Sequence, residues 1–203
     1  MRSLSDVLYN FHWVEPGKAA RAAQAYAGFL GPFLKARGIR AVVNLRGPNP
    51  GYWWWRYETG TCARLGILHR DVKLNSRQLP TREMLLALLD AFQSVPQPFL
   101  VKCSGGQDRT SFASALYLLD TQGWTVLPQA EAQFARWPYL HLPHTQQRWL
   151  RLFPAFAREH AAGAALRDWI ATRYSPEDLK AWLVARGEGN SFRKIYGAPV
   201  AGA

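Results

Sequence analysis

The sequence predicts an α/β domain built on a mostly parallel central sheet flanked by helices, with a helical extension at the C-terminus. Three short apolar runs, at residues 41–45, 67–74 and 99–102, have the length and composition of buried strands. Helical patterns lie between these runs, and strands that alternate with helices favour a parallel sheet covered on both faces. From Pro128 onward the pattern is only helical, which predicts the extension.

The helices of the first part of the chain are assigned from apolar periodicity and from residues typical of helix ends. An Ala- and Leu-rich stretch ends at Gly38, which is typical of a helix C-terminus. The clearest helix opens at Pro80 and Thr81 and places its apolar residues on one face. The four predicted helices span residues 22–37, 57–65, 81–92 and 111–120.

Three further helices are predicted in the C-terminal region. The first is amphipathic, covers residues 144–160 and contains a proline as an interruption. The second covers residues 164–174, and the third begins with Ser175 as N-cap and Pro176 at its first helical position. Residues 187–203 are expected to be loosely ordered.

Composition and charge limit the class of protein and its partners. The 203 residues suit one compact domain, and a hydrophobic content of 48% excludes a disordered chain. The net charge of +11 favours anionic partners such as phosphorylated substrates or anionic lipid headgroups. Lys and Arg are scattered and no zinc-finger or RNA-binding pattern is present, so nucleic acid is not expected as a partner.

The cysteine content and the lack of long apolar runs indicate a cellular compartment. Two cysteines, Cys62 and Cys103, do not make a disulfide framework, which favours a reducing environment. The first residues lack the apolar core of a signal peptide, and no run is long enough for a membrane span. We therefore expect a cytoplasmic protein, with peripheral membrane contact as an option.

The stretch "VKCSGGQDRT", residues 101–110, joins a predicted strand to a predicted helix through a glycine-rich turn. Such a turn presents several backbone N–H groups to one point, where the helix N-terminus adds partial positive charge. Arg109 at the rim of this anion site can bind phosphate bidentately, and the same field favours a nucleophilic thiolate at Cys103. Thr110 could donate a hydrogen bond to the sulfur and help it to leave.

Residues 103–110, "CSGGQDRT", resemble the CX5R-[ST] phosphate-binding loop of the cysteine-dependent protein tyrosine and dual-specificity phosphatases. The Asp-Arg-Thr ending is most similar to a subset that includes bacterial atypical dual-specificity phosphatases. The segments "VEPGKAARAAQ" and "GIRAVVNLRG" also resemble this family, and the similarity extends from Phe11 to about Phe156. Two residues depart from it: Lys102 stands where the family usually has His, and Ser111 where it usually has Gly.

This resemblance implies the cysteine-phosphatase fold and its chemistry. It implies a phosphatase domain at residues 1–158, with a C-terminal helical extension at residues 159–203 packed on the same domain. The expected activity is hydrolysis of phosphomonoesters through a phosphocysteine intermediate at Cys103, without metal or cofactor. Arg109 would hold the phosphoryl oxygens together with the loop amides, and Thr110 would assist the thiolate. The phosphate-binding residues would be Ser104, Gly105, Gly106, Gln107, Asp108 and Arg109.

The general acid that protonates the leaving group is left open between two aspartates. Asp71 lies upstream of Cys103 at a spacing similar to that of dual-specificity phosphatases. Local similarity instead puts the acid position at Asn75 or Ser76, which leaves Asp71 inside a strand. Asp108 lies within the loop itself and could approach the leaving group or only shape the loop. A third possibility is that neither aspartate acts.

The substrate class is also left open. Phosphotyrosine or phosphoserine in a protein and a phospholipid or phosphoinositide are all compatible with the sequence. The alternative to an enzyme is a catalytically weak, phosphate-binding pseudophosphatase that acts as an interaction module. This alternative is motivated by the unclear acid and by Lys102, whose charge favours a thiolate only if it points toward the loop.

Three further features carry weaker expectations. The aromatic stretch around Trp53, Trp54 and Trp55 is expected to be a loop over the C-terminal helices, with a pocket wall or a membrane contact as the alternative. Cys62 is expected to be a buried helical cysteine rather than a disulfide partner of Cys103. Four basic residues could add positive charge around the pocket or be ordinary surface charges: Arg46, Arg56, Lys73 and Arg77.

Overall fold

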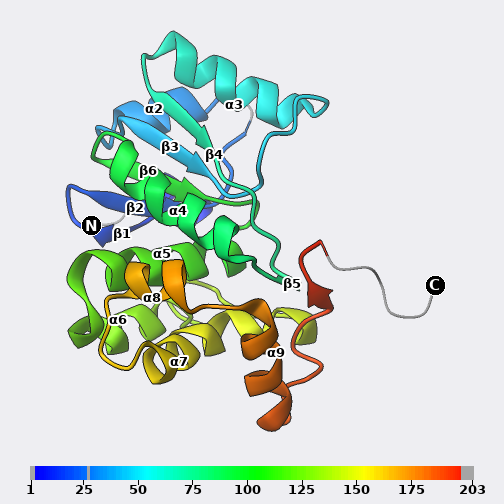
Figure 1. Ribbon diagram of the computed structural model, residues 1–203. Coiled ribbons are helices and arrows are strands. Elements are labelled where there is room, and N and C mark those ends of the chain that lie inside the picture. The colour runs from blue at the N-terminus through cyan, green and yellow to red at the C-terminus, as the bar shows by residue number, and fades with distance from the viewer. Residues whose placement is uncertain (1–2, 27, 198–203) are drawn as a thin grey trace.

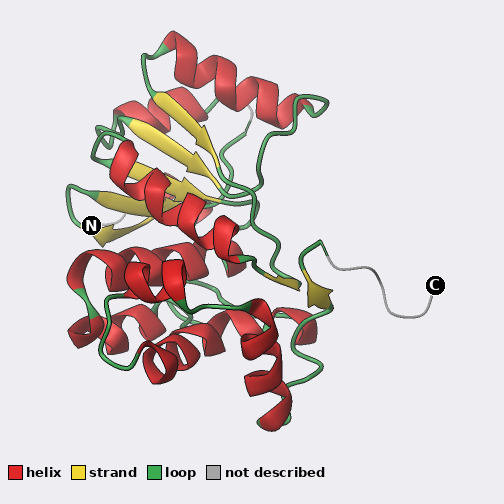
Figure 2. Ribbon diagram, in the orientation of Figure 1, coloured by secondary structure: helices red, strands yellow, loops and turns green. Residues whose placement is uncertain are grey.

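The computed structural model describes residues 3–26 and 28–197 and confirms the predicted fold class (Figures 1 and 2). In this part of the chain, five strands form a sheet in the order β1-β2-β6-β3-β4. The edge strand β1 pairs antiparallel with β2, and the other neighbours pair parallel. The strands are β1 (His12–Glu15), β2 (Ala19–Ala22), β3 (Ala41–Asn44), β4 (Leu68–Asp71) and β6 (Phe99–Lys102).

Helices cover both faces of this sheet (Figure 2). On one face lie α2 (Leu30–Lys35) and α3 (Trp53–Arg64), and on the other lie α4 (Arg82–Ser94) and α5 (Asp108–Gln122). Because strand side chains alternate, Val42 and Leu100 belong to the first core, whereas Val43 and Val101 belong to the second. The remaining helices are α1 (Leu4–Leu8), α6 (Leu127–Ala132), α7 (Trp149–Ala161), α8 (Leu166–Thr172) and α9 (Pro176–Ala185).

The register of the sheet aligns the carboxyl ends of its parallel strands. Asn44 of β3 is level with Lys102 of β6 on one side and with Asp71 of β4 on the other. Ala22 of β2 completes the row on the far side of β6. Cys103 follows Lys102 directly, so the cysteine loop lies at this edge, where ligands bind in open parallel sheets.

The helix predicted over residues 22–37 is wrong in its first half. Residues Ala19–Ala22 form β2, which is buried along its whole length, and α2 begins only at Leu30. Alanine favours helices in isolated peptides, but here it fits a strand between two neighbours, and tertiary packing overrides the local preference. No element was predicted at the position of the edge strand β1.

Other elements differ from the predictions mainly at their ends. Helix α3 begins at Trp53 and α5 at Asp108, each several residues before the predicted start. The expectation of an only-helical region after residue 128 is wrong at one place. There β7 (Lys194–Ile195) pairs with β5 (Gln78–Leu79) in a separate two-stranded sheet, so part of the expected loose end is ordered. The rest of that end, residues 198–203, lies outside the described residues.

The C-terminal helices share a core with α4 and α5. Phe153 of α7 contacts Phe112 of α5 at a centroid distance of 5.2 Å, and Tyr174 donates a hydrogen bond to the carbonyl of Pro80 at 2.7 Å. Ser175 caps α9 by accepting a hydrogen bond from the Asp178 amide at 3.0 Å, as predicted. The division into residues 1–158 and an extension stays a prediction. None of the described helices is long and apolar enough to cross a lipid bilayer.

Candidate active site

The cysteine loop is a tight connection from β6 into α5. Cys103 is buried, with 4% of its surface exposed, while Ser104 and Gly105 are exposed at the mouth. The carbonyl of Ser104 accepts a hydrogen bond from the Gln24 amide at 2.9 Å. This bond ties the loop to the segment that follows β2.

Gly106 is the position where the loop approaches another part of the backbone. It has a positive φ of +65°, and a Cβ built on it would lie 2.5 Å from the amide nitrogen of Ala23. Its carbonyl accepts hydrogen bonds from Asn10 Nδ2 at 3.2 Å and from Arg21 Nη2 at 3.0 Å. Only glycine satisfies both the φ angle and the close approach, so this glycine fixes the shape of the loop.

The backbone amides of the loop are open to a ligand. In the described chain, the N–H groups of Ser104 through Arg109 donate no hydrogen bond to a backbone carbonyl. They lie at and before the first turn of the fifteen-residue helix α5, where unpaired N–H groups and the helix dipole favour an anion. These amides and the helix N-terminus together form a candidate anion site, and the phosphate-binding role of residues 104–109 stays a prediction.

A buried guanidinium supports the loop from the inside. Arg21 of β2 is fully buried and donates to the Ser111 hydroxyl at 2.8 Å as well as to the Gly106 carbonyl. Its other terminal nitrogen donates to the backbone and side-chain oxygens of Gln133, both at 3.0 Å. Burial lowers the pKa of Arg21 to about 10, which still leaves a cation at neutral pH. Sequence reasoning missed Arg21, although a single arginine within an alanine run was a visible signal.

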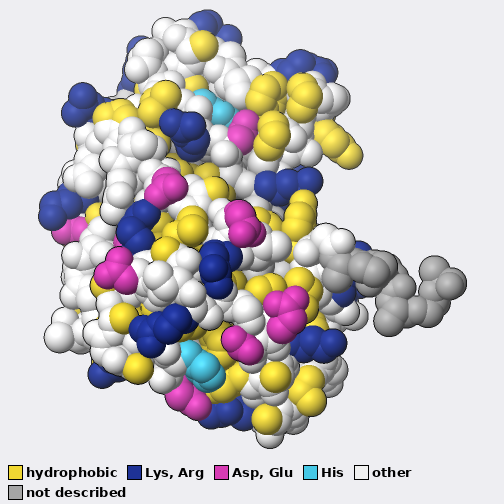
Figure 3. All heavy atoms as spheres, in the orientation of Figure 1, with side chains coloured by type: hydrophobic (Ala, Val, Ile, Leu, Met, Phe, Trp, Pro, Cys, Tyr) yellow, Lys and Arg dark blue, Asp and Glu magenta, His cyan; other side chains and the backbone are white. Residues whose placement is uncertain are grey.

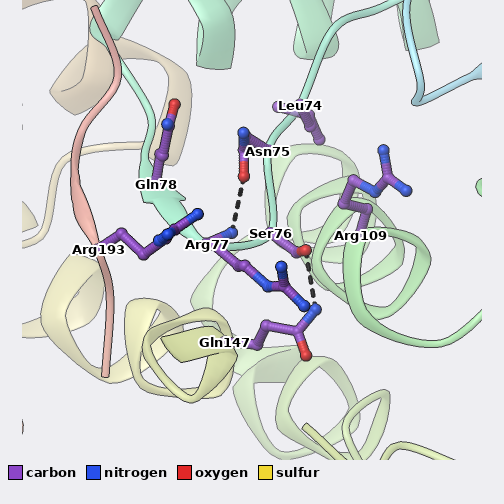
Figure 4. A pocket seen from close by; sticks show the side chains of 8 residues that line it. All are labelled: Leu74, Asn75, Ser76, Arg77, Gln78, Arg109, Gln147 and Arg193. Carbon is purple, nitrogen blue, oxygen red and sulfur yellow. Dashed lines mark hydrogen bonds between the residues drawn. The ribbon is translucent and has the colours of Figure 1, made fainter. Parts of the chain in front are cut away.

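Arg109 and Thr110 occupy the first turn of α5. Arg109 is half-buried and lines a cavity of about 410 Å³ (Figure 4). Thr110 is fully buried, and its hydroxyl has no hydrogen-bond partner among the described residues. Both side chains are therefore available to a ligand or to the sulfur, as the motif predicts.

Asp108 begins α5, and its two carboxyl oxygens have different surroundings. Oδ2 accepts a hydrogen bond from Gln147 Nε2 at 3.1 Å, while Oδ1 is buried without a hydrogen-bond partner among the described residues. His141 Nδ1 lies 3.5 Å from Oδ1, but burial lowers the pKa of His141 to about 4, so this ring is neutral. Burial also raises the pKa of Asp108 above its usual value, despite the opposing charges of Arg109 and His144.

Gln147 links Asp108 to the loop that follows β4. Its Nε2 donates to the Ser76 hydroxyl at 2.9 Å as well as to Asp108, as Figure 4 shows for the serine. Its Oε1 accepts from the backbone amide of His144 at 3.0 Å, which fixes the orientation of the amide group. Sequence reasoning missed this residue because nothing local to Gln147 indicates that it reaches Asp108.

Asp71 is the last residue of β4, as local similarity indicated, and donors engage both of its oxygens. Asn44 Nδ2 donates to it at 2.6 Å, and Trp55 Nε1 lies 3.0 Å from Oδ2 and 3.2 Å from Oδ1. Its carboxylate thus connects β3, β4 and α3. Asn75 and Ser76, where similarity put the acid, lie at the edge of the cavity that Arg109 lines.

Lys102 points toward α3 and meets a buried carboxylate there. Its Nζ lies 2.7 Å from Glu58 Oε1 and 2.6 Å from Gln24 Oε1, and both charged side chains are 1% exposed. Glu58 also bonds His69 Nε2 at 2.8 Å. Burial lowers the pKa of Lys102, opposed mainly by Glu58, and Lys102 and His69 hold the pKa of Glu58 below its usual value against the effect of burial.

The aromatic stretch does not cover the C-terminal helices, and the prediction that placed it there is wrong. Trp53, Trp54 and Trp55 form the first turn of α3, on the opposite face of the sheet. Trp54 is buried and stacks under the guanidinium of Arg46 at 3.4 Å from the ring centroid, with Lys102 Nζ at 5.3 Å. Trp54 therefore contacts two cations behind the loop and Trp55 donates to Asp71, whereas Trp53 is exposed.

Of the four basic residues left open between a role at the pocket and an ordinary surface position, only Arg77 lines the cavity. Arg56 donates to the Pro50 carbonyl at 2.8 Å, and Lys73 lies 5.9 Å from the ring centroid of Tyr196. On the face shown in Figure 3, Lys and Arg side chains are dispersed and acidic side chains lie among them. This face has no continuous basic surface of the kind that a nucleic acid needs.

Both cysteines are free, and they belong to different cores. Cys62 lies on α3 in the core between the sheet and α2, whereas Cys103 belongs to the core under α4 and α5. Burial raises the pKa of Cys62 to about 12, so its thiol stays protonated. The expectation of a buried helical cysteine is confirmed. Within the described residues, no three His, Cys, Asp or Glu side chains lie together as a metal-binding group.

No protein-family model matches the chain, and no curated protein sequence matches it at a significant level. Solved structures do. TpbA of P. aeruginosa is 16% identical with a TM-score of 0.54, over 87% of this chain and 92% of that chain. A TpbA variant in complex with pTyr is 17% identical with a TM-score of 0.57, over 84% and 95% of the two chains.

The core catalytic domain of the PP-IP phosphatase SIW14 from S. cerevisiae, in complex with citrate, is also similar. It is 18% identical with a TM-score of 0.52, over 88% of this chain and 93% of that chain. The sheet order, the loop at its carboxyl edge and these similarities together define the fold of the cysteine-dependent phosphatases. The chain has this fold.

Proposed function

We propose that the protein is a metal-independent phosphomonoester hydrolase that acts through a phosphocysteine intermediate. The observation that carries the proposal is the cysteine loop itself. In it, a buried Cys103 lies at the base of open backbone amides, and two side chains hold the Gly106 carbonyl in place. Similarity in fold to phosphatases supports the same conclusion.

In the first step, the Cys103 thiolate attacks phosphorus, and an S–P bond forms as the ester P–O bond breaks. The leaving oxygen takes a proton from Asp108. In the second step, water attacks phosphorus and gives its proton to Asp108, the S–P bond breaks, and inorganic phosphate leaves. The loop amides and Arg109 stabilise the charge on the phosphoryl oxygens in both steps.

Three features of the site favour a thiolate at Cys103. The N-terminus of α5 contributes partial positive charge, and the Arg21 guanidinium lies behind the loop. The unpartnered Thr110 hydroxyl can donate a hydrogen bond to the sulfur when it leaves phosphorus. Lys102 is not one of these features, because its side chain turns to the α3 side of the sheet and its charge is paired with that of Glu58.

Asp108 suits the role of general acid better than Asp71. A raised pKa keeps more of the Asp108 carboxyl protonated at neutral pH, and Oδ1 is the oxygen without a hydrogen-bond partner. Gln147 donates to Oδ2, which leaves Oδ1 to carry the proton. Asp71, by contrast, accepts hydrogen bonds from Asn44 and Trp55, and these hold its side chain in a structural position between β3, β4 and α3.

The substrate is a phosphorylated molecule whose class stays open between a phosphoprotein and a phospholipid or phosphoinositide. Structures of the same fold were solved with pTyr, as for TpbA, and with PI(5)P, as for PTPMT1. PTPMT1 in that complex is 16% identical with a TM-score of 0.51, over 75% of this chain and 99% of that chain. A cytoplasmic location is proposed from the sequence.

Turnover of phenyl phosphate by the purified protein tests the proposal. Wild type should release phosphate, Cys103→Ser should release none, and Arg109→Lys should be severely impaired because an ammonium cannot replace the bidentate guanidinium. Cys103→Ser should still bind inorganic phosphate. Substantial turnover by Cys103→Ser would rule out the phosphocysteine mechanism. Phosphate binding without turnover by wild type would instead favour the pseudophosphatase alternative.

A further inference from the structure

The cavity beside the cysteine loop extends away from Arg109 along the β5–β7 sheet (Figure 4). Its lining holds three guanidinium groups and no carboxylate. Most of the other lining side chains are uncharged and polar, and Leu74 is the one apolar residue among them. The residues that line it are Leu74, Asn75, Ser76, Arg77, Gln78, Arg109, Gln147 and Arg193.

Backbone pairing places two of these arginines side by side. The amide of Arg193 donates to the carbonyl of Arg77 at 2.7 Å, and the amide of Tyr196 donates to the carbonyl of Leu79 at 2.9 Å. The segment before Arg193 is anchored, because Ser191 and Phe192 are buried. The C-terminal segment therefore fixes the backbone position of Arg193, whose exposed side chain lines a cavity that Arg109 also lines.

The two arginines also face a second hollow. A neighbouring cavity of about 480 Å³ is lined by Arg77 and Arg193 together with His144, Thr145, Gln146 and Asn190. Both arginines line the two cavities and therefore lie where these cavities adjoin. A substrate larger than one phosphate group and its ester carbon has space on this side of the loop.

The charge of this surface is not compensated by the protein. Among the described residues, Arg77, Arg109 and Arg193 form no ion pair. Glu188, the nearby acidic residue of the same segment, is paired with Arg148. A bound anion would interact favourably with all three guanidinium groups that line the cavity.

We propose that Arg77 and Arg193 form a subsite for a second phosphate group of the substrate, whose first phosphate occupies the Cys103 loop. The proposal rests on the proposed function and narrows its substrate to a multiply phosphorylated small molecule or headgroup. Guanidinium groups bind phosphate in bidentate fashion, and Asn75, Ser76 and Gln78 can contact the hydroxyls of a polyol. The cavity lacks the apolar walls that an aromatic ring would need. The second phosphate is bound and is not cleaved.

Matched substrates test this subsite. Inositol 1-phosphate and inositol 1,4-bisphosphate differ by one phosphate, so their kcat/KM values report its contribution, while phenyl phosphate reports the chemistry. Arg77→Gln and Arg193→Gln should each lower kcat/KM for the bisphosphate about tenfold more than for phenyl phosphate, mainly through KM. The control for loss of one positive charge is Arg70→Gln, because Arg70 is exposed on β4 and lies outside the cavity.

The outcomes separate the subsite from the proposed function. The subsite would be overturned if Arg77→Gln and Arg193→Gln lowered kcat/KM equally for the bisphosphate and for phenyl phosphate. It would also be overturned if Arg70→Gln lowered kcat/KM for the bisphosphate by the same factor. If wild type turns over none of the three esters, the hydrolase proposal fails and calorimetry on Cys103→Ser decides the subsite. When Arg77→Gln or Arg193→Gln is added to Cys103→Ser, binding of inositol 1,4-bisphosphate should then weaken about tenfold. Unchanged binding would reject the subsite. To decide whether the substrate is a lipid or a soluble ester, kcat/KM for a dioctanoyl lipid that carries the same bisphosphate headgroup is compared with kcat/KM for inositol 1,4-bisphosphate.

Discussion

The Lys102 ammonium and the Glu58 carboxylate form an ion pair, with Nζ 2.7 Å from Oε1, and both side chains are 1% exposed. Lys102 precedes Cys103 in the chain, so this pair lies directly behind the cysteine loop. Removing one partner would leave an uncompensated charge in a site that water does not reach.

Glu58→Gln should lower the free energy of unfolding by about 3 kcal/mol at pH 7, because a buried ammonium loses its counter-ion. The double variant Glu58→Gln/Lys102→Met should recover part of this loss, since both buried charges are then gone. Urea unfolding of the wild type and the three variants, including Lys102→Met, completes a double-mutant cycle. Additive losses would show that the two residues do not interact.

The pH dependence of stability has a defined sign at Glu58. Its folded pKa is lower than its ordinary value, so the stabilisation it provides is present above that ordinary value. The stabilisation is lost as pH falls through the lowered folded value. Wild type should therefore lose more stability than Glu58→Gln/Lys102→Met as the pH falls below the ordinary pKa of a glutamate, as measured by thermal unfolding. Identical pH profiles of the two proteins would contradict this.

Asp108→Asn should slow hydrolysis of phenyl and alkyl phosphates about a hundredfold or more and spare esters whose activated leaving groups need no proton. In wild type, kcat for phenyl phosphate should fall as pH rises through the raised pKa of Asp108, and this limb should disappear in the variant. Asp71→Asn is the matched comparison, and it should leave the rate of phenyl phosphate hydrolysis nearly unchanged. The reverse pattern would assign the acid to Asp71.

Stability distinguishes a loss of the acid from a loss of the fold. Because the folded state raises the pKa of Asp108, ionisation of this residue at neutral pH opposes folding. The uncharged Asp108→Asn variant should therefore unfold at the same temperature as wild type or a higher one at pH 7. A marked fall in its melting temperature would indicate that Asp108 shapes the loop.

Gly106→Ala should destabilise the protein by at least about 2 kcal/mol and abolish turnover, since a Cβ meets the backbone of residues 22 and 23 and φ is positive. Gly105→Ala is the control, because its Cβ would lie 3.6 Å from the Gln107 side chain, an ordinary contact. Thermal unfolding and phenyl phosphate turnover check both. Equal effects of the two substitutions would show that the close approach at Gly106 is unimportant.

Activity on phenyl phosphate should persist in chelator and be lost to thiol alkylation or peroxide, because the proposed nucleophile is a thiolate. Cys62 contributes little to alkylation, since burial raises its pKa to about 12. Mass spectrometry after limited iodoacetamide treatment should find the label on Cys103. Loss of activity in EDTA, restored by a divalent ion, would argue for a metal-dependent mechanism.

The cysteine loop could be predicted from sequence because its residues are consecutive and each has a local physical role. Arg21, Gln147 and Arg193 could not, because each reaches the site through a tertiary contact with a segment far away in the chain. The same reason explains the misplaced helix at residues 22–37. Only its first residue, Ala22, belongs to β2 between β1 and β6, and residues 23–26 and 28–29 form no helix although the local composition favours one.

The buried arginine behind the loop also bears on the order in which the molecule assembles. Arg21 and Gly106 are 85 positions apart in the chain, and β2 is synthesised long before its neighbour β6. Closing so long a connection costs chain entropy and is slow compared with helix formation. Recovery of turnover after dilution from denaturant should therefore lag behind the return of helical circular dichroism, and a nascent chain would acquire catalytic competence only once β2 and β6 had paired.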